Sequence, residues 1–496
     1  MGTLKKLVGQ TAVYGLSSIV GRLLNYFLVP WYTRIFTQAE YGIVTDLYAY
    51  AVVFLILLTY GMETAFFNFS KQEKDTSSVY TTSLVSLFST SLFFILLAWI
   101  FMSPIANAMG YTNKSIYILW FAIIISFDAF LSLPFAQLRL QGKSMQFAII
   151  KLFSIAINIF FNVLFLMILP NCFKQGQFPE LAKMFYQYDL VAYVFISNLL
   201  ASLFTTFLLL PSIFKHNGFF SFPLLKKMLL YSGPLLIAGL AGSVNEVFDR
   251  ILLKYMLVIP STVSNAGEYV MSQIGIYGAN YKLSIIMTLF IQTFRYAFEP
   301  FFFSQADKKD SRDMYALIMK YFVIFGLAIF LFVMAGIEIF QYFIGEGFRE
   351  GLHIVPILLL ANLFLGIVFN LSLWYKLSGK TSYGAYIAII GAIITLVFNA
   401  ALIPFIGYTG SAWATLICYV SMAVISLVWG QKHYKIDYPV KSIVLYIIFA
   451  LFLFMLGKVH IAQSLVYQYV YQFALVGIFV ATSIFIELKN RKLGKI

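Results

Sequence analysis

The feature that most constrains this chain is a series of apolar runs, each long enough to cross a lipid bilayer as a helix. A transmembrane helix needs about 20 predominantly apolar residues. Of the 496 residues, 61% are hydrophobic and only 11% are charged, which is far from the composition of soluble domains. The sequence therefore predicts an all-α polytopic membrane protein with about 14 transmembrane helices. The runs fall near residues 9–32, 41–66, 77–102, 116–138, 145–169, 189–213, 228–258, 273–298, 315–343, 353–375, 383–405, 409–430, 443–457 and 467–486.

The basic residues between these runs indicate how the helices are oriented. If the N-terminus is cytoplasmic, 22 Lys and Arg residues fall in cytoplasmic segments and six in external segments. Cytoplasmic loops of membrane proteins are enriched in Lys and Arg. We therefore expect both termini to lie in the cytoplasm.

The chain resembles itself at a shift of 236 to 237 residues. Two apolar, Phe-rich helices often match by chance, but matched Glu, Lys and Asn residues in separate blocks are harder to explain in that way. The charged and amide pairs are Glu63 and Glu299, Lys143 and Lys380, and Asn162 and Asn399. Two halves of six helices share one orientation and are related by an axis along the membrane normal. This predicts two pseudo-symmetric lobes, residues 1–227 (spans 1–6) and 228–430 (spans 7–12), followed by residues 431–496 with spans 13 and 14 and a cytoplasmic tail.

Six basic residues lie inside predicted spans, where a central Lys or Arg costs about 2.5–3.5 kcal/mol on insertion scales. They are Arg22, Lys151, Arg250, Lys254, Lys282 and Arg295. Such residues mark hydrated cavities, ion pairs or substrate routes. Arg22 and Asn25 share one polar face of span one at helical spacing. Structural alternatives remain, because Glu246 can neutralise Arg250 four residues away and Arg295, near a helix end, can reach the interface.

Acidic residues also lie in or at the edges of the spans, and they suggest ion coupling. They are Asp46, Glu63, Asp128, Glu246, Asp249 and Glu299. A carboxylate in apolar surroundings favours its protonated form and can therefore carry a proton. A proton or sodium gradient would then drive transport. The alternative, which we favour for most of them, is a structural ion pair with a Lys or Arg of another helix.

Several segments resemble a known family of membrane proteins. Residues 13–18 (VYGLSS), 22–24 (RLL) and 40–42 (EYG) resemble the start of Wzx-type polysaccharide (O-antigen) flippases. Residues 249–253 (DRILL), 274–279 (IGIYGA) and 281–283 (YKL) resemble the second-half signature of the same family. This family is part of the multidrug/oligosaccharidyl-lipid/polysaccharide exporter superfamily, which also includes multidrug exporters and the lipid II flippase.

The resemblance implies a flippase that moves undecaprenyl-pyrophosphate-linked oligosaccharide across the bacterial cytoplasmic (inner) membrane by alternating access. Membrane lipids, a polysaccharide polymerase and glycosyltransferases are the expected partners. Arg suits a pyrophosphate because its planar guanidinium pairs bidentately with phosphate oxygens. The residues expected to bind the pyrophosphate and sugar headgroup are Arg22, Asn25, Arg250, Lys254, Lys282 and Arg295.

Other functions remain as alternatives at this point. The lipid II flippase of peptidoglycan synthesis would share the cationic cavity, whereas a cation-coupled multidrug antiporter should have a cavity dominated by carboxylates. A membrane polysaccharide polymerase or ligase usually has a large external catalytic loop, and the longest external loop here, about residues 170–188, has few reactive groups. Two Cys and four scattered His residues offer no metal-ligand spacing. We expect no enzyme activity, no cofactor and no nucleic-acid partner, although the net charge is +14.

Overall fold

The computed structural model describes residues 15, 17, 19–21, 23–111, 114–215, 218–304, 311–459 and 464–492, which are almost entirely helical. A few side chains inside helices, including that of Glu299, are outside the described part. Within this described part of the chain, twelve helices are long and apolar enough to cross a membrane, and one bent pair makes a thirteenth. These 13 coincide with the predicted spans 2–14, whereas the first, 9–32, falls largely outside the described residues. The predicted fold class is confirmed.

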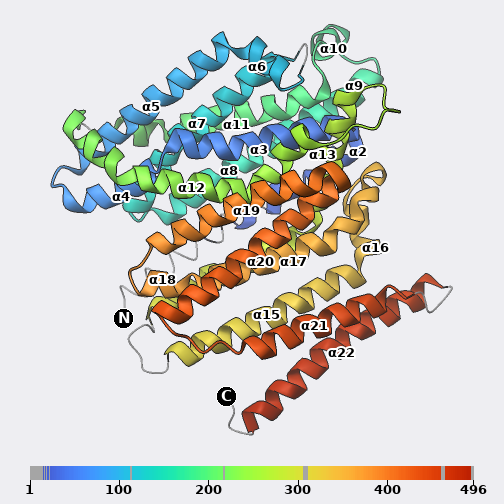
Figure 1. Ribbon diagram of the computed structural model, residues 1–496. Helices are drawn as coiled ribbons and strands as arrows, with labels where there is room; N and C mark the ends of the chain where they lie inside the picture. The colour runs from blue at the N-terminus through green and yellow to red at the C-terminus, as the bar shows by residue number, and fades with distance from the viewer. Residues whose placement is uncertain are drawn as a thin grey trace. The chain divides into compact units, whose positions relative to one another are not determined.

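The chain divides into two compact units, Met1–Gly275 and Ile276–Ile496 (Figure 1). In the first unit, α7 packs against α3, α5 and α11, α8 packs on α11, and α12 packs along α3. The helices of this unit are α2 (Val29–Ile35), α3 (Gln38–Thr59), α4 (Met62–Gln72), α5 (Thr76–Ile100), α6 (Met102–Ala108), α7 (Ile116–Leu140), α8 (Ser144–Val163), α9 (Leu169–Lys174), α10 (Pro179–Phe185), α11 (Leu190–Phe214) and α12 (Phe222–Met256). A π-helical turn, Leu164–Ile168, joins α8 to α9.

A two-residue break divides the second predicted span into α3 and α4. Tyr60 and Gly61 both have left-handed backbone conformations, with φ of 32° and 71°. Glycine adopts this conformation without the steric cost that a Cβ imposes. The Tyr60 hydroxyl forms a hydrogen bond of 2.6 Å with Ser86 Oγ on α5, which fixes the position of the break.

The second unit contains the bent span and the two helices that lie outside the repeat. Its helices α15 and α21, α15 and α22, α17 and α20, and α19 and α20 pack against one another. The helices are α14 (Ile285–Ser304), α15 (Ser311–Ala335), α16 (Ile337–Phe340), α17 (Val355–Leu371), α18 (Leu373–Leu377), α19 (Ser382–Ile406), α20 (Tyr408–His433), α21 (Val440–Gly457) and α22 (Leu465–Lys492). Short 3-10 segments span Gln341–Phe343 and Glu346–Ile354. Helix α13 (Ala266–Leu283) begins in the first unit and ends in the second.

Span eight bends by 47° between α13 and α14. Ser284 lies at the break, and its hydroxyl donates a hydrogen bond to the Tyr281 carbonyl at 2.7 Å. The same hydroxyl accepts a hydrogen bond from Asn362 Nδ2 of α17 at 3.0 Å. A broken helix is tolerated at membrane depth only where protein groups satisfy the freed polar atoms. The Ser284 hydroxyl does so for the Tyr281 carbonyl, and Asn362 holds that hydroxyl in place.

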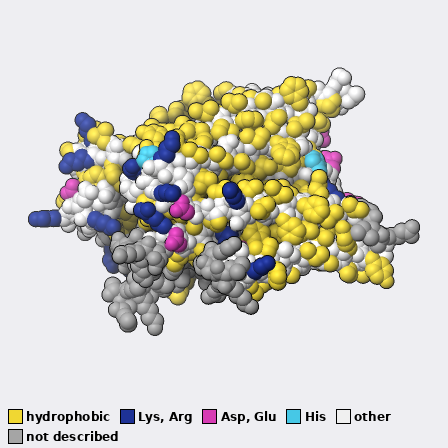
Figure 2. Space-filling view, turned by 60° about the horizontal axis from the view of Figure 1, so that its bottom comes forward, with side chains coloured by type: hydrophobic (Ala, Val, Ile, Leu, Met, Phe, Trp, Pro, Cys, Tyr) yellow, Lys and Arg dark blue, Asp and Glu magenta, His cyan; other side chains and the backbone are white. Residues whose placement is uncertain are grey.

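The outer faces of the helices are apolar, as a lipid environment requires. Phe93, Phe207 and Phe405 expose 62%, 69% and 85% of their surface. Figure 2 shows a face that is mainly hydrophobic, with its Lys and Arg side chains gathered in one part of it. Exposed apolar surface on this scale marks membrane contact rather than a soluble surface.

The boundary of the compact units differs from the lobe boundary that the repeat predicts. The units divide at Gly275, whereas the repeat divides the chain between residues 227 and 228. The difference arises because α12 packs on α3, α4 and α5. The lobe boundary therefore stays a prediction.

Candidate functional site

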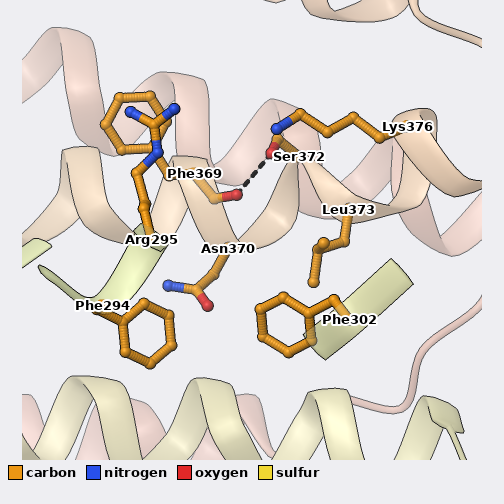
Figure 3. A pocket seen from close by; sticks show the side chains of 8 residues that line it. All are labelled: Phe294, Arg295, Phe302, Phe369, Asn370, Ser372, Leu373 and Lys376. Atoms are coloured by element: carbon orange, nitrogen blue, oxygen red, sulfur yellow. Dashed lines mark hydrogen bonds between the residues drawn. The ribbon is translucent and has the colours of Figure 1, made fainter. Parts of the chain in front are cut away.

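A pocket with a basic and polar wall lies in the second unit (Figure 3). It is partly open and is formed by α14, the end of α17 and α18. Its lining residues are Phe294, Arg295, Phe302, Phe369, Asn370, Ser372, Leu373 and Lys376. The loops that follow α14 and α18 are among those that the positive charges predict to be cytoplasmic.

Arg295 is the one predicted headgroup residue in this pocket. Its guanidinium carbon lies 4.1 Å from the centre of the Phe369 ring, a cation–π contact that holds a cation over the ring face. No ion pair of Arg295 is found among the described side chains, which do not include Glu299, four residues along the helix. An aromatic ring orients the guanidinium but does not neutralise its charge.

The junction of α17 and α18 adds further polar groups to the pocket. Ser372 lies between the two helices, and its hydroxyl donates a hydrogen bond of 2.6 Å to the Phe369 carbonyl. The amide of Asn370 donates to the Gly366 carbonyl at 3.0 Å, which leaves its side-chain oxygen on the pocket side in Figure 3. Lys376 follows one turn later. The pocket thus combines two cations with hydroxyl and amide groups.

The rings of Phe294 and Phe302 form the opposite wall of the pocket (Figure 3). Phe294 stacks on Phe298 with ring centres 4.4 Å apart, and Phe302 packs edge-on against Tyr315 at 5.2 Å. A cationic wall that faces an aromatic wall suits a ligand with an anionic group next to an apolar chain.

In the first unit, the structure pairs Lys254 with Asp46. The Lys254 Nζ atom lies 2.5 Å from Asp46 Oδ2. Exposed fractions of the two side chains are only 5% and 0%. The hydroxyl of Tyr111 also donates to Asp46, and the ammonium lies 4.4 Å from the centre of the Tyr111 ring. The predicted headgroup residue Lys254 and the predicted coupling residue Asp46 are therefore engaged with each other in this state.

Three tyrosines enclose this ion pair. Besides Tyr111, the rings of Tyr50 and Tyr255 lie 5.7 and 5.9 Å from the Lys254 ammonium. The hydroxyls of Tyr50 and Tyr255 are 2.9 Å apart and share a hydrogen bond. Tyr111 lies outside the spans, and burial, followed by the nearby Asp46 carboxylate, raises its pKa well above the usual range. Its hydroxyl therefore stays protonated and donates to the carboxylate.

Arg250 has a different partner from the one that helical spacing suggested. Its Nη1 atom lies 3.5 Å from Asp249 Oδ1 and donates to the backbone carbonyl of Glu246 at 3.0 Å. The Glu246 side chain is exposed. Arg250 and Asp249 are both largely buried, with exposed side-chain fractions of 11% and 4%.

The remaining predicted residues are distributed over both units. Glu63 forms an ion pair with Arg139, and exposed Asp128 accepts a hydrogen bond from Ser202 at 3.3 Å. Asn25 is exposed, and Lys282 is partly buried at the end of α13. Arg22 and the side chain of Glu299 lie outside the described residues. The roles assigned to all of these residues stay predictions.

Sequence reasoning missed three polar residues of the pocket: Asn370, Ser372 and Lys376. Lys376 lies at the start of a loop that the positive charges predict to be cytoplasmic, and it stands 237 residues after Arg139, at the shift of the repeat. That correspondence was a usable signal. Asn370 and Ser372 gave no such signal, because they carry no charge and the sequence does not show which face of the helix lines the pocket.

Residues 7–306 match the family model described as polysaccharide biosynthesis protein. No curated protein sequence matches the chain.

Solved structures show the same fold at low sequence identity. The chain is similar to the lipid II flippase MurJ in an inward closed conformation, with a TM-score of 0.71, 15% identity, and 97% of this chain and 99% of that chain covered. It is also similar to an inward-facing multidrug resistance MATE family transporter of the MOP superfamily, with a TM-score of 0.64, 12% identity, and coverage of 83% and 94%. A third match is a MOP superfamily transporter from Pyrococcus furiosus, with a TM-score of 0.55, 12% identity, and coverage of 86% and 95%.

Proposed function

Because the chain belongs to the polysaccharide biosynthesis protein family, we propose that it is a flippase for undecaprenyl-pyrophosphate-linked oligosaccharide. The cargo would move from the inner to the outer leaflet of the bacterial cytoplasmic membrane by alternating access. The fold shared with MOP superfamily structures and the basic residues within the spans support this proposal. A polysaccharide polymerase and glycosyltransferases would be its partners in the same pathway.

The observation that carries the proposal is the pocket around Arg295. A lipid-linked pyrophosphate is an anion attached to a long isoprenoid chain. Arg295 and Lys376 on one wall suit the anion, because charge-assisted hydrogen bonds to phosphate are among the strongest in proteins. Phe294 and Phe302 on the other wall suit the isoprenoid. Small-molecule sites commonly combine an apolar lining with a few placed polar groups.

The position of the pocket supports a role at the entrance. With both termini in the cytoplasm, the loops after α14 and α18 are cytoplasmic, and the pocket opens near the inner leaflet where the cargo is made. Deeper in the membrane, Arg22, Asn25, Arg250, Lys254 and Lys282 would then contact the headgroup as it crosses. The acidic residues would supply coupling to a proton or sodium gradient.

The test replaces Arg295 in a strain that depends on this chain for its surface polysaccharide. Loss of hydrogen bonds to a charged group costs about 1.5–3 kcal/mol, so Arg295→Ala should reduce flipping roughly 10-fold to 100-fold. Lipid-linked intermediate should accumulate, as measured by extraction and mass spectrometry. The matched control is Lys435→Ala, because Lys435 is an exposed loop cation with an exposed partner.

Two outcomes would contradict the proposal. Normal surface polysaccharide in Arg295→Ala combined with Lys376→Ala, at normal protein levels, would remove the pocket from the mechanism. Rescue of a strain that lacks its lipid II flippase, without any effect on polysaccharide, would assign the chain to peptidoglycan synthesis instead.

A further inference from the structure

Helix α12 is assigned to different halves by the repeat and by its packing. The repeat predicts it as the first helix of the second half, residues 228–430. In the structure it belongs to the compact unit Met1–Gly275 and packs along α3, α4 and α5. The repeat assigns α12 to the second half, but α12 packs against helices of the first half. We infer that such a helix lies where the two halves contact each other.

The first contact that holds α12 is the enclosed ion pair. Asp46 lies in the third turn of α3, in its N-terminal half, and Lys254 lies in the last turn of α12. The loop charges predict that the start of α3 and the end of α12 are external. Tyr111, which donates to Asp46, lies between α6 and α7 in a segment that is also predicted to be external. The pair therefore joins three segments that lie near the side predicted to be external.

The second contact is a close crossing of α3 and α13, one helical turn from Asp46. A Cβ atom built on Gly42 would lie 1.9 Å from the backbone oxygen of Met271, and one built on Gly275 would lie 2.0 Å from that of Gln38. No side chain larger than hydrogen fits at either position. Small residues allow transmembrane helices to approach to backbone contact in this way.

From these two contacts we propose that the external ends of α3, α12 and α13 form a gate, with Asp46–Lys254 as its latch. The inference rests on the proposed function, since alternating access requires an external closure that opens. In the closed state Lys254 neutralises Asp46, and neither residue binds cargo. When the gate opens, the pair separates and both charges reach water.

The incomplete hydrogen bonding of the pair makes opening feasible. Among the described residues, Asp46 Oδ1 has no hydrogen-bond partner. A buried ion pair loses the hydration of both charges, and this loss offsets much of its Coulomb attraction. Separation of the two charges into water restores that hydration. The ion pair therefore favours the closed gate but still allows it to open.

The gate can be tested with a reporter thiol beneath the latch. Ala49 is 3% exposed and packs against Val247 and Ile251 of α12. The reporter is Ala49→Cys in the full chain with Cys172→Ser and Cys418→Ser. A membrane-impermeant maleimide added from outside intact cells should label this reporter slowly. Both Lys254→Met and Gly42→Ala should raise the labelling rate at least tenfold, the first by removing the latch and the second by separating α3 from α13.

Two controls separate gate opening from general damage. Gly242→Ala adds a Cβ to α12 where no atom lies within 4 Å and should leave labelling unchanged. The charge exchange Asp46→Lys with Lys254→Asp should restore slow labelling, which an unfolded chain would not do. Labelling of both Lys254→Met and Gly42→Ala within twofold of the parent, at normal membrane levels, would overturn the gate.

Labelling does not depend on the cargo. If deletion of this protein leaves surface polysaccharide intact but Lys254→Met still raises the labelling rate, the gate would be supported and the proposed cargo refuted. Unchanged labelling in a chain that is required for surface polysaccharide would refute the gate and leave the proposed function standing.

Discussion

The two helices outside the repeat are attached through a buried charge, and this attachment gives the sharpest stability prediction. Glu487 on α22 forms an ion pair with Lys320 on α15. Glu487 also accepts a hydrogen bond of 2.8 Å from the Tyr446 hydroxyl on α21. One carboxylate thus joins α21 and α22 to the helix they pack on. The perturbation is Glu487→Gln, which keeps the shape of the side chain and removes its charge.

The size of the effect follows from burial. Lys320 and Glu487 have exposed side-chain fractions of 7% and 10%, so the ammonium that remains after substitution has little access to water. Removal of one partner of a buried ion pair typically costs about 3–5 kcal/mol. At 1.36 kcal/mol for each factor of ten, the undocked population of α21 and α22 should rise roughly a hundredfold to several thousandfold.

Limited proteolysis of the purified full chain measures this population, because cleavage of an opened segment tracks the opening equilibrium when closing is fast. The expected cleavage is in the segment between α20 and α21. The double variant Lys320→Met, Glu487→Met should be close to the parent, because an apolar pair can replace a buried ion pair at little cost. The matched surface control is Asp437→Asn, whose partner Lys435 is 66% exposed. Exposed ion pairs contribute about 0–1 kcal/mol.

The reasoning would be refuted by either of two results. Cleavage of Glu487→Gln at the parental rate would show that the pair does not dock the helices. A double variant as sensitive to protease as the single variant would show that packing at these positions matters and charge does not.

Three further predictions concern stability in detergent. Asp75 caps α5, and hydrogen bonds from Ser78 lower the pKa of its carboxyl group. The parent should therefore be more stable than Asp75→Ala near pH 7, and this difference in stability should disappear as the pH falls through the lowered pKa. The difference in Tm between the two proteins at each pH measures it. Tyr32→Phe should cost about 0.5–1.5 kcal/mol, because the Tyr32 hydroxyl donates to buried Asn162 at 2.6 Å, and a denaturant titration that finds no loss would contradict this. Gly61→Ala should cost about 1–2 kcal/mol because a Cβ is disfavoured at φ +71°, whereas Gly242→Ala, where space is open, should be neutral or slightly stabilising.

The fold could be predicted from the sequence because insertion of a helix into a membrane depends on its own composition. Each span must satisfy its backbone internally, so a long apolar run is sufficient evidence for a helix. The details that escaped prediction are departures from regular helix. The break at Tyr60 and the bend at Ser284 depend on partners in other helices, Ser86 and Asn362, which the local sequence does not reveal.

The sequence predicted that the site is basic, but it predicted only some of the residues that form it. Arg295 stood out because a cation inside an apolar run is rare. The pairing of Lys254 with Asp46 joins positions 208 residues apart, and no local pattern connects them. The sequence did favour such structural ion pairs for most of the acidic residues, and Asp46, Glu63 and Asp249 all lie next to a cation.

The basic residues within the spans have different partners, which suggests that they have different functions. Lys254 and Arg250 each lie beside a carboxylate, so in this state their charge is largely neutralised within the protein. Among the described side chains, which leave out Glu299, Arg295 contacts an aromatic ring and no carboxylate. A pyrophosphate gains most from a cation that is not already neutralised, because a neutralised cation must first give up its own partner. Lys254 should therefore act mainly on the equilibrium between closed and open states, and its substitution should change cargo binding at the entrance less than substitution of Arg295, which lines the pocket.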